Sequence, residues 1–483
     1  MYCQLETLRH CLPPSVRSSL DELPETLDET YERVLRDINK TNRDHAHRLL
    51  QCLTVAIRPL RVEELAEVLS VDFDAAQRDG IPKLNPDWRW EDQHQAVLST
   101  CSSLIITVDD GGFQVVQFSH FSVKEFLTSE RLASSSGDIS RYHVDLKPAH
   151  TILAQACLGV LLDLDNQVNQ FNVKDLPLVE YAAQHWVDHA QFENVSSSIQ
   201  AAMEYFFDAG KPHWAAWLRV YNMDTSWLYF GHSSGTDGGP LYYAALCGFY
   251  NLVEHLVAEH PQDINAKGGR NKTPMVAALY GEHFQVAELL RQHGADIDER
   301  DNEKCTSLHI ASMEGLVDVT QWLLGHGANV NVQQDELWTP LHLATINGHL
   351  EVAQMLLEHK ADIHTRNGDG RVALHLASGP YTTRDQLEIT QLLLCHGAYT
   401  NVLDDTGSTP LHESLSNSTS SRKTFKPSAA VIRLLLKHGA NIDVENHKGK
   451  TPLQIASEGG YHEILELLLE HGAKNTQYGY GSI

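Results

Sequence analysis

Positively charged residues are scarce in this chain of 483 residues, which has 37 Lys and Arg against 63 Asp and Glu and a formal net charge of −26. A surface this acidic repels phosphate backbones and anionic membranes, so we expect neither nucleic acid nor a membrane among its partners. The eight cysteines are scattered and include no C-x-x-C pair. This spacing argues against a disulfide framework and against a structural zinc site.

Long apolar runs and nucleotide-binding loops are also absent. No apolar run approaches the roughly 18 residues that a membrane helix needs, and the opening MYCQLETLRHC lacks the basic and then apolar order of a signal peptide. No G-x-x-x-x-G-K-[ST] occurs, so nucleotide hydrolysis by this chain is excluded. These absences predict a cytoplasmic protein of several domains that needs no cofactor.

The C-terminal half contains an internal repeat with a period of about 33 residues. Its clearest copy is WTPLHLATINGHLEVAQMLLEHKADI, residues 338–363, and a Gly-Ala pair ends most copies. Seven copies align at Pro240, Pro274, Ser307, Pro340, Ala373, Pro410 and Pro452. The pattern resembles the ankyrin repeat over residues 236–474. This resemblance implies stacked helix pairs whose apolar faces form one continuous core.

The recurring residues of the repeat can be explained by the way in which helices begin and end. Thr339 is placed to cap the first helix, and Pro340 occupies the first turn, where a missing N–H costs nothing. The glycine of the Gly-Ala pair ends the second helix in the left-handed conformation. Lys360 takes the place of that glycine in the fourth copy, so we expect a strained or differently closed helix end there.

Histidines recur at two positions of the repeat. Because they are so regular and no ligand cluster at zinc spacing accompanies them, we interpret them as hydrogen-bonding scaffold residues and expect no metal site. The first set, after T-P-L, is His309, His342, His375 and His412, and the second, before Gly-Ala, is His293, His326, His359, His396, His438 and His471.

Ankyrin arrays characteristically bind proteins, and the family leaves two solvent-facing residues between the inner-helix alanines and the following glycine. In the first four copies these pairs read Leu246-Cys247, Leu279-Tyr280, Met313-Glu314 and Ile346-Asn347. An apolar residue stands first in each pair, which predicts a protein-binding surface; the alternative is that neighbouring repeats partly cover these side chains. The candidate contact residues are Leu246, Leu279, Tyr280, Met313, Glu314, Trp338, Ile346 and Asn347.

The N-terminal half alternates helical segments with one hairpin. Pro24 marks the entry of a first helix, and Asp109-Asp110-Gly111-Gly112 supplies hairpin turn chemistry. The expected helices cover residues 20–38, 46–57, 61–71, 91–103 and 122–132, and the hairpin covers 104–118. A loop rich in Pro, Asp and Trp precedes the helix at 91–103. Three helices and a hairpin predict a winged helix over 41–135. Its third helix contains Glu91 and Asp92 but no Lys or Arg, so we do not expect this domain to bind DNA.

The segments LPETLDETYERVL, IRPLRVEELAEVLSVDF and QFSHFSVKEFL resemble the winged-helix region that follows the NACHT NTPase in fungal STAND (NLR-like) proteins, a domain also named after a GPI inositol-deacylase. The resemblance implies a helical remnant of the preceding region at 1–40, a helical spacer and linker at 136–235, and a tail at 475–483. The expected fold class is mainly α: a winged helix with a small β-hairpin, a helical spacer, and an α-solenoid of ankyrin repeats.

The motif F-x-H-x-S-x-x-E-F-L contains His120. In related NACHT proteins the histidine of this motif contacts the ADP phosphate. The resemblance therefore implies that His120 is a nucleotide sensor only if an NTPase is present. Two possibilities stay open: the NTPase is encoded upstream of Met1, or this product lacks it. The alternative is a structural histidine at the start of the last helix.

Gly231-His232-Ser233-Ser234-Gly235 spells G-x-S-x-G, the turn that carries the nucleophile of many serine hydrolases. The residues after Ser233 cannot begin a helix before Pro240, and only repeats follow, whereas a nucleophile turn needs an immediate helix in an α/β sheet. We therefore favour a non-catalytic protein-binding module, the sensor and regulatory half of a STAND signalling protein. A serine hydrolase using Ser233 is the alternative.

Overall fold

The computed structural model describes residues 26–135, 137–164, 176–221, 238–268, 272–301, 303–379, 385–416 and 427–474. Ser233 and its motif lie outside the described residues, as does the expected tail at 475–483. The chain forms two compact units, Met1–Pro261 and Gln262–Ile483. Among the described helices, none is both long and apolar enough to cross a membrane.

A winged helix opens the first unit. Its elements are α3 (Leu27–Asp37), α4 (Arg43–Val55), β1 (Leu60–Arg61), α5 (Val62–Val68), α7 (Gln93–Cys101), β4 (Ile105–Asp110), β5 (Phe113–Phe118), α8 (Phe121–Leu127) and α9 (Glu130–Ala133). The strands form an antiparallel sheet in the order β1-β5-β4, and Gly111 and Gly112 turn the expected hairpin with φ of 60° and 91°. The mainly helical fold class is confirmed. The two-residue strand β1 was not predicted.

Three local differences separate the winged helix from its prediction. Within the described residues, the helix expected at 20–38 begins at Leu27, because the Thr26 side chain accepts the hydrogen bond of the Glu29 N–H; residues 20–25 lie outside the described residues. The expected loop before α7 contains α6 (Phe73–Asp79), between β2 (Val71–Asp72) and β3 (Lys83–Leu84). The last helix is interrupted after Leu127, since the Ser129 hydroxyl caps α9 by accepting from the Leu132 N–H.

The helical spacer packs on the first repeat. It comprises α10 (Leu146–Leu161), α11 (Val179–Gln191), α12 (Val195–Ser198), α13 (Gln200–Phe206) and α14 (Pro212–Val220), and the repeat comprises α16 (Pro240–Leu246) and α17 (Tyr250–Glu259). Trp186 is fully buried and its ring centroid lies 5.4 Å from that of Phe249. The Gln191 side chain donates to the carbonyl of Cys247 over 2.7 Å. The first repeat therefore shares a core with the spacer.

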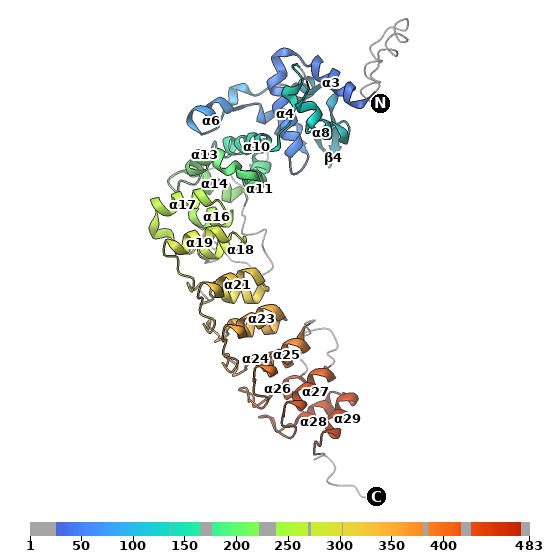
Figure 1. Cartoon of the computed structure of the whole chain (residues 1–483), viewed down its shortest axis with the longest axis vertical. Coiled ribbons are helices and arrows are strands. Elements are labelled where there is room, and N and C mark those ends of the chain that lie inside the picture. Colours follow the sequence, from blue (N-terminus) through green and yellow to red (C-terminus); the bar gives the residue numbers. More distant parts are fainter. Residues whose placement is uncertain are drawn as a thin grey trace. The chain divides into compact units, whose positions relative to one another are not determined.

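The second unit is a succession of helix pairs (Figure 1). The inner helices are α18 (Pro274–Tyr280), α20 (Ser307–Glu314), α22 (Pro340–Asn347), α24 (Ala373–Ser378), α26 (Pro410–Glu413) and α28 (Pro452–Glu458). The outer helices are α19 (Phe284–Gln292), α21 (Val317–Gly325), α23 (Leu350–Glu358), α25 (Gln386–Cys395), α27 (Ala429–Lys437) and α29 (His462–Glu470). Thr339 caps α22 and Pro340 begins it, as expected from the sequence.

The scaffold role is confirmed for most of the repeat histidines, although the buried Nε2 of His342 has no hydrogen-bond partner among the described residues. His309 accepts at Nδ1 from the Thr306 N–H (3.2 Å), and its Nε2 donates to the carbonyl of Trp338 in the next repeat (3.1 Å). His375 and His412 make the same bond to the next repeat, at 3.1 Å each. In five members of the second set, Nδ1 donates to the carbonyl four residues earlier, for example from His326 to Trp322 at 2.7 Å; the other four are His293, His359, His396 and His471. Within the described residues, no group of three or more potential metal ligands gathers.

Burial has an electrostatic consequence for the first set of histidines. It lowers the pKa of His309, His342 and His375 to about 4, and it also lowers the pKa of His412. These imidazoles are therefore neutral at pH 7, which suits the rings of His309, His375 and His412, since each accepts at one nitrogen and donates at the other.

Lys360 adopts the left-handed conformation of the glycines that it replaces. Its φ is 67°, against 86° for Gly327 and 88° for Gly397 at the same place in neighbouring copies. A side chain with a Cβ is strained in this region. The expectation of a strained helix end is therefore confirmed.

A row of side-chain bonds joins consecutive repeats of the second unit. In each bond an Asn or Asp side chain accepts from the backbone N–H that follows the Gly-Ala pair of the next repeat, or Lys360-Ala361 in the fourth copy. The pairs are Asn265 with Asp296, Asp298 with Asn329, Asn331 with Asp362, Asn401 with Asn441, and Asp443 with Lys474. His364 stands at this place in the fourth repeat, and its ring stacks instead on Tyr399, with centroids 4.1 Å apart.

Candidate protein-binding surface of the repeats

Most of the predicted contact residues reach the surface. Met313 is 38% exposed, Glu314 and Asn347 are exposed, and Tyr280, Trp338 and Ile346 are partly exposed. Leu246 is partly exposed too, on the first unit. The prediction for Leu279 is wrong, since this side chain is 2% exposed and belongs to the core.

The error at Leu279 is an alignment error of one residue. The left-handed residue that ends the inner helix is Glu282 (φ 57°), which corresponds to Gly348 (φ 81°), whereas Gly281 has an ordinary negative φ. Leu279 therefore corresponds to the buried Thr345, and Tyr280 corresponds to Ile346. The histidine after the turn, His283 or His349, would have given the correct alignment.

Tyr280 is held in a defined position on this surface. The ammonium of Lys272 lies 4.2 Å from the centre of its ring and donates a hydrogen bond to its hydroxyl over 3.0 Å. Tyr280 remains partly exposed. Tyr280, Met313 and Ile346 thus occupy equivalent positions on three consecutive inner helices, which we call the inner-helix row.

A polar groove lies further along the second unit and was not predicted. It encloses about 520 Å³ and is lined by residues of the fifth, sixth and seventh repeats. Its lining includes Glu413, Leu415, Lys450 and Tyr461. Helix α26 has four residues whereas α22 has eight, so the chain leaves the helical path where other inner helices continue. The shortened helix makes room for the groove.

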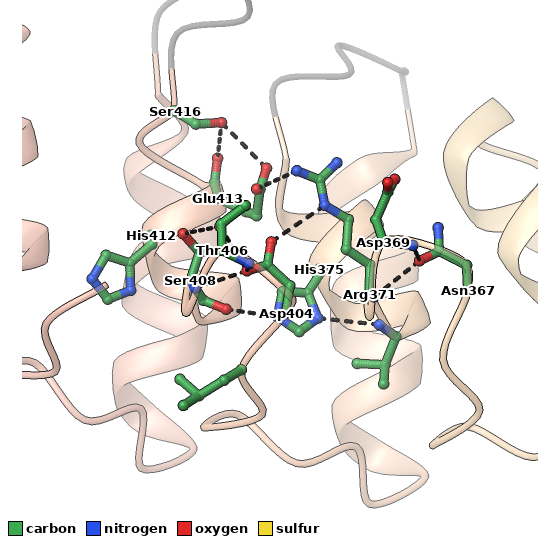
Figure 2. A network of polar contacts seen from close by, with 12 residues as sticks. Asn367, Asp369, Arg371, His375, Asp404, Thr406, Ser408, His412, Glu413 and Ser416 are labelled. Carbon is green, nitrogen blue, oxygen red and sulfur yellow. Dashed lines mark hydrogen bonds and ion pairs between the residues drawn. The ribbon is translucent and has the colours of Figure 1, made fainter. Parts of the chain in front are cut away.

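The groove residues Arg371 and Glu413 belong to a network of charged groups, whose two carboxylates, Asp404 and Glu413, are buried (Figure 2). Arg371 donates from Nη2 to Glu413 over 2.7 Å and lies 3.4 Å from Asp404 through Nε. Asp404 accepts from the N–H groups of Thr406 (2.9 Å) and Ser408 (2.8 Å). These bonds come from three segments of chain, so the network fixes the hairpins of two repeats to an inner helix.

The two carboxyl groups of this network differ in acidity. Burial raises the pKa of Glu413, and the charge of Arg371 offsets this only in part. Burial also opposes ionisation of Asp404, but hydrogen bonds from Thr406 and Ser408 outweigh it and lower the pKa of that group. Asp404 is therefore the firmly ionised partner of Arg371.

The groove is lined by polar binding groups, and its histidine belongs to the scaffold of the repeats. His412 accepts from the Thr409 N–H at Nδ1 and donates to the carbonyl of Lys450 at Nε2, so both nitrogens are committed. Lys448, at the rim, is exposed and makes no ion pair with any described residue. Hydroxyl, amide and ammonium groups beside Tyr461 suit the backbone and side chains of a peptide.

His120 is placed by the structure as the cap of α8. Its Nδ1 accepts from the N–H of Ser122 over 3.2 Å and lies 2.7 Å from the Ser122 hydroxyl, which in turn lies 2.8 Å from the hydroxyl of Tyr31. Because Nδ1 accepts, the proton of the neutral ring is on Nε2. The ring is exposed, so a structural role and a nucleotide-sensing role both remain compatible with this geometry.

Comparisons with known proteins agree with this architecture. Residues 32–137 match the family described as GPI inositol-deacylase, winged helix domain. Residues 241–334 and 374–478 match ankyrin repeats in three copies, and residues 326–377 match ankyrin repeats in many copies. The chain is 31% identical over 278 residues to the Azaphilone pigments biosynthesis cluster protein L of Monascus ruber, a match that covers 54% of this chain and 57% of that relative. The chain thus contains a winged helix of this type followed by ankyrin repeats.

Proposed function

We propose that this chain is a non-catalytic protein-binding module and forms the sensor and regulatory half of a STAND-type (NLR-like) signalling protein in the cytoplasm. The observation that carries the binding role is the inner-helix row, three partly exposed apolar or aromatic side chains at equivalent positions of successive ankyrin repeats. Partly exposed aromatic and apolar anchors are the usual centre of a protein interface. The polar groove supplies directional groups on the same unit.

The non-catalytic part of the proposal is supported by the composition of the described cavities. The groove in the repeats has its histidine committed to scaffold bonds. Its Ser416 hydroxyl lies 3.2 Å from Glu413, but that carboxylate is already paired with Arg371. A second cavity, of about 210 Å³ beside β5, is lined by apolar residues with Arg58 and Gln117 and contains no serine, cysteine, histidine or carboxylate. A hydrolase site needs a nucleophile next to a base.

The binding role is tested by charge substitution in the full-length chain. Met313→Glu with Ile346→Glu is expected to abolish capture of the partner in pull-downs from the organism that encodes the protein, with an unchanged thermal unfolding midpoint. The matched control is Leu469→Glu, because Leu469 is 47% exposed but lies on the outer helix α29. If both variants retain the same captured proteins, the row is not the binding surface.

The catalytic alternative needs its own assay. We expect the full-length chain to hydrolyse neither generic esters nor ATP. Ester turnover that disappears in the Ser233→Ala variant would establish the hydrolase instead.

A further inference from the structure

The winged-helix unit displays two tryptophans on one short loop. Trp88 is 49% exposed and Trp90 is 46% exposed, in the segment between β3 and α7. Exposed large aromatic side chains are costly to leave in water and are the most frequent anchors of protein interfaces. The winged helix itself does not use them, since its core is formed by other residues.

The residue between the two tryptophans fixes the loop to the domain. Arg89 donates through Nε to both carboxylate oxygens of Glu67, at 3.0 and 3.1 Å, and through Nη2 at 2.5 Å. The Glu67 side chain, on α5, is 1% exposed. Such a bidentate bond to a buried carboxylate holds the guanidinium in one orientation.

This anchor also fixes the backbone between the two tryptophans. Trp88 is the last residue of a 3-10 helix, Pro86–Trp88, and Arg89 follows it in an extended conformation, with φ of −67° and ψ of 134°. Because Arg89 is bound to Glu67, the backbone that carries the exposed Trp88 and Trp90 is held before a partner binds, which reduces the ordering cost of binding.

The charges around the tryptophans are negative. Asp87, Glu91 and Asp92 are exposed, and none of them forms an ion pair with a described residue. The charge of Arg89 is neutralised by Glu67, and the nearby Lys83 lies 3.6 Å from Asp79. A cation near the two exposed indole rings would therefore be attracted both by the aromatic rings and by carboxylates that form no ion pair with a described residue.

We propose that the loop of Trp88, Arg89 and Trp90 is a second docking site, which binds a basic, arginine-containing segment of a protein partner by stacking guanidinium groups on the two indoles. Arginine suits the site better than lysine, because its planar group stacks on aromatic rings and also forms paired hydrogen bonds with carboxylates. The three carboxylates disfavour nucleic acid and anionic lipid at the same place.

The experiment measures binding of a fluorescein-labelled peptide, acetyl-(Gly-Arg)5-amide, to the full-length chain by fluorescence anisotropy. The double variant Trp88→Leu/Trp90→Leu is expected to weaken binding about tenfold or more. Asp87→Asn with Glu91→Gln is expected to weaken it several-fold while the tryptophans remain. The (Gly-Lys)5 peptide, of equal charge, should bind the unchanged chain more weakly than the arginine peptide.

The control variant is Phe113→Leu. Phe113 is 51% exposed in the same winged helix, but the guanidinium of Arg61 already lies 4.0 Å from its ring centre, so its loss should leave peptide binding unchanged. Equal affinity of the tryptophan double variant and the unchanged chain would overturn the proposal. So would tryptophan-dependent binding of phosphatidylserine vesicles in preference to the arginine peptide, which would make the loop a lipid-binding site.

Discussion

The guanidinium of Arg371 lies 2.7 Å from the carboxylate of Glu413, although the two residues are separated by 42 positions in the chain. Glu413 occupies the repeat position at which Leu343 and Leu376 are buried in other copies. The Glu413 side chain is 9% exposed and that of Arg371 is 22% exposed. An ion pair thus replaces an apolar contact between the fifth and sixth repeats.

Removing one partner of this pair should destabilise the second unit strongly. We expect Glu413→Ala to lower the free energy of unfolding by roughly 2–3 kcal/mol, somewhat less than for a fully buried pair because Arg371 is partly exposed. Glu413→Leu should cost less, since leucine restores the residue type of the other copies. A double-mutant cycle with Arg371→Ala, followed by urea unfolding, measures the coupling; additive effects would contradict the assigned contact.

The buried histidines predict a loss of stability in acid. Burial lowers the pKa of His309, His342 and His375 to about 4 from 6.5 in the unfolded chain, so between these values the unfolded state binds more protons. Stability is therefore complete above pH 6.5 and is lost as the pH falls towards 4. Urea unfolding at pH 7, 6 and 5 should show this decline.

The seventh repeat supplies a variant that isolates one of these histidines. Gln454 stands at the histidine position there, and its side-chain oxygen accepts from the Thr451 N–H over 2.9 Å. His309→Gln should keep this capping bond and remove one titrating group, which reduces the pH slope by up to about 1.4 kcal/mol per pH unit. An unchanged slope between pH 5 and 6 would show that His309 does not titrate as described.

Adjacent residues Leu279 and Tyr280 should respond very differently to substitution. Leu279 is 2% exposed, so Leu279→Ala should cost about 2–4 kcal/mol through lost burial and the cavity that remains. Tyr280→Ala removes a partly exposed side chain and should cost less, while affecting partner binding. Chemical denaturation of the two variants compares these costs, and the opposite order would restore the alignment that places Leu279 at the surface.

Relief of backbone strain should stabilise the fourth repeat. Because Lys360 has a φ of 67°, Lys360→Gly should raise the free energy of unfolding by about 1 kcal/mol. The reciprocal variant, Gly327→Ala, places a Cβ at a φ of 86° and should be destabilising. Thermal unfolding checks both signs; a destabilised Lys360→Gly would mean that contacts of the lysine side chain outweigh the strain.

The sequence predicted those parts of the fold that depend on local signals. Helix caps such as Thr339, the Gly111-Gly112 turn and the period of the repeats all act within a few residues, so they are readable without a structure. The groove was missed because it depends on the contact between Arg371 and Glu413 and on the early end of α26. Strand β1 was missed because two residues, Leu60 and Arg61, carry no periodicity and pair only with the distant β5.

The stacked rings of His364 and Tyr399 join two repeats through an aromatic contact, whereas the other described junctions of this row are hydrogen bonds. Elsewhere in the row, successive repeats are joined by a hydrogen bond from a peptide N–H to an Asn or Asp oxygen. Because the donor is the backbone, this bond tolerates substitution of the residue that supplies the N–H. Between the fourth and fifth repeats this bond is replaced by the aromatic contact, so substitution of either ring can weaken the junction. In a linear array each repeat is stabilised by its neighbours, so this junction is the place where we expect partial unfolding of the array to begin or end.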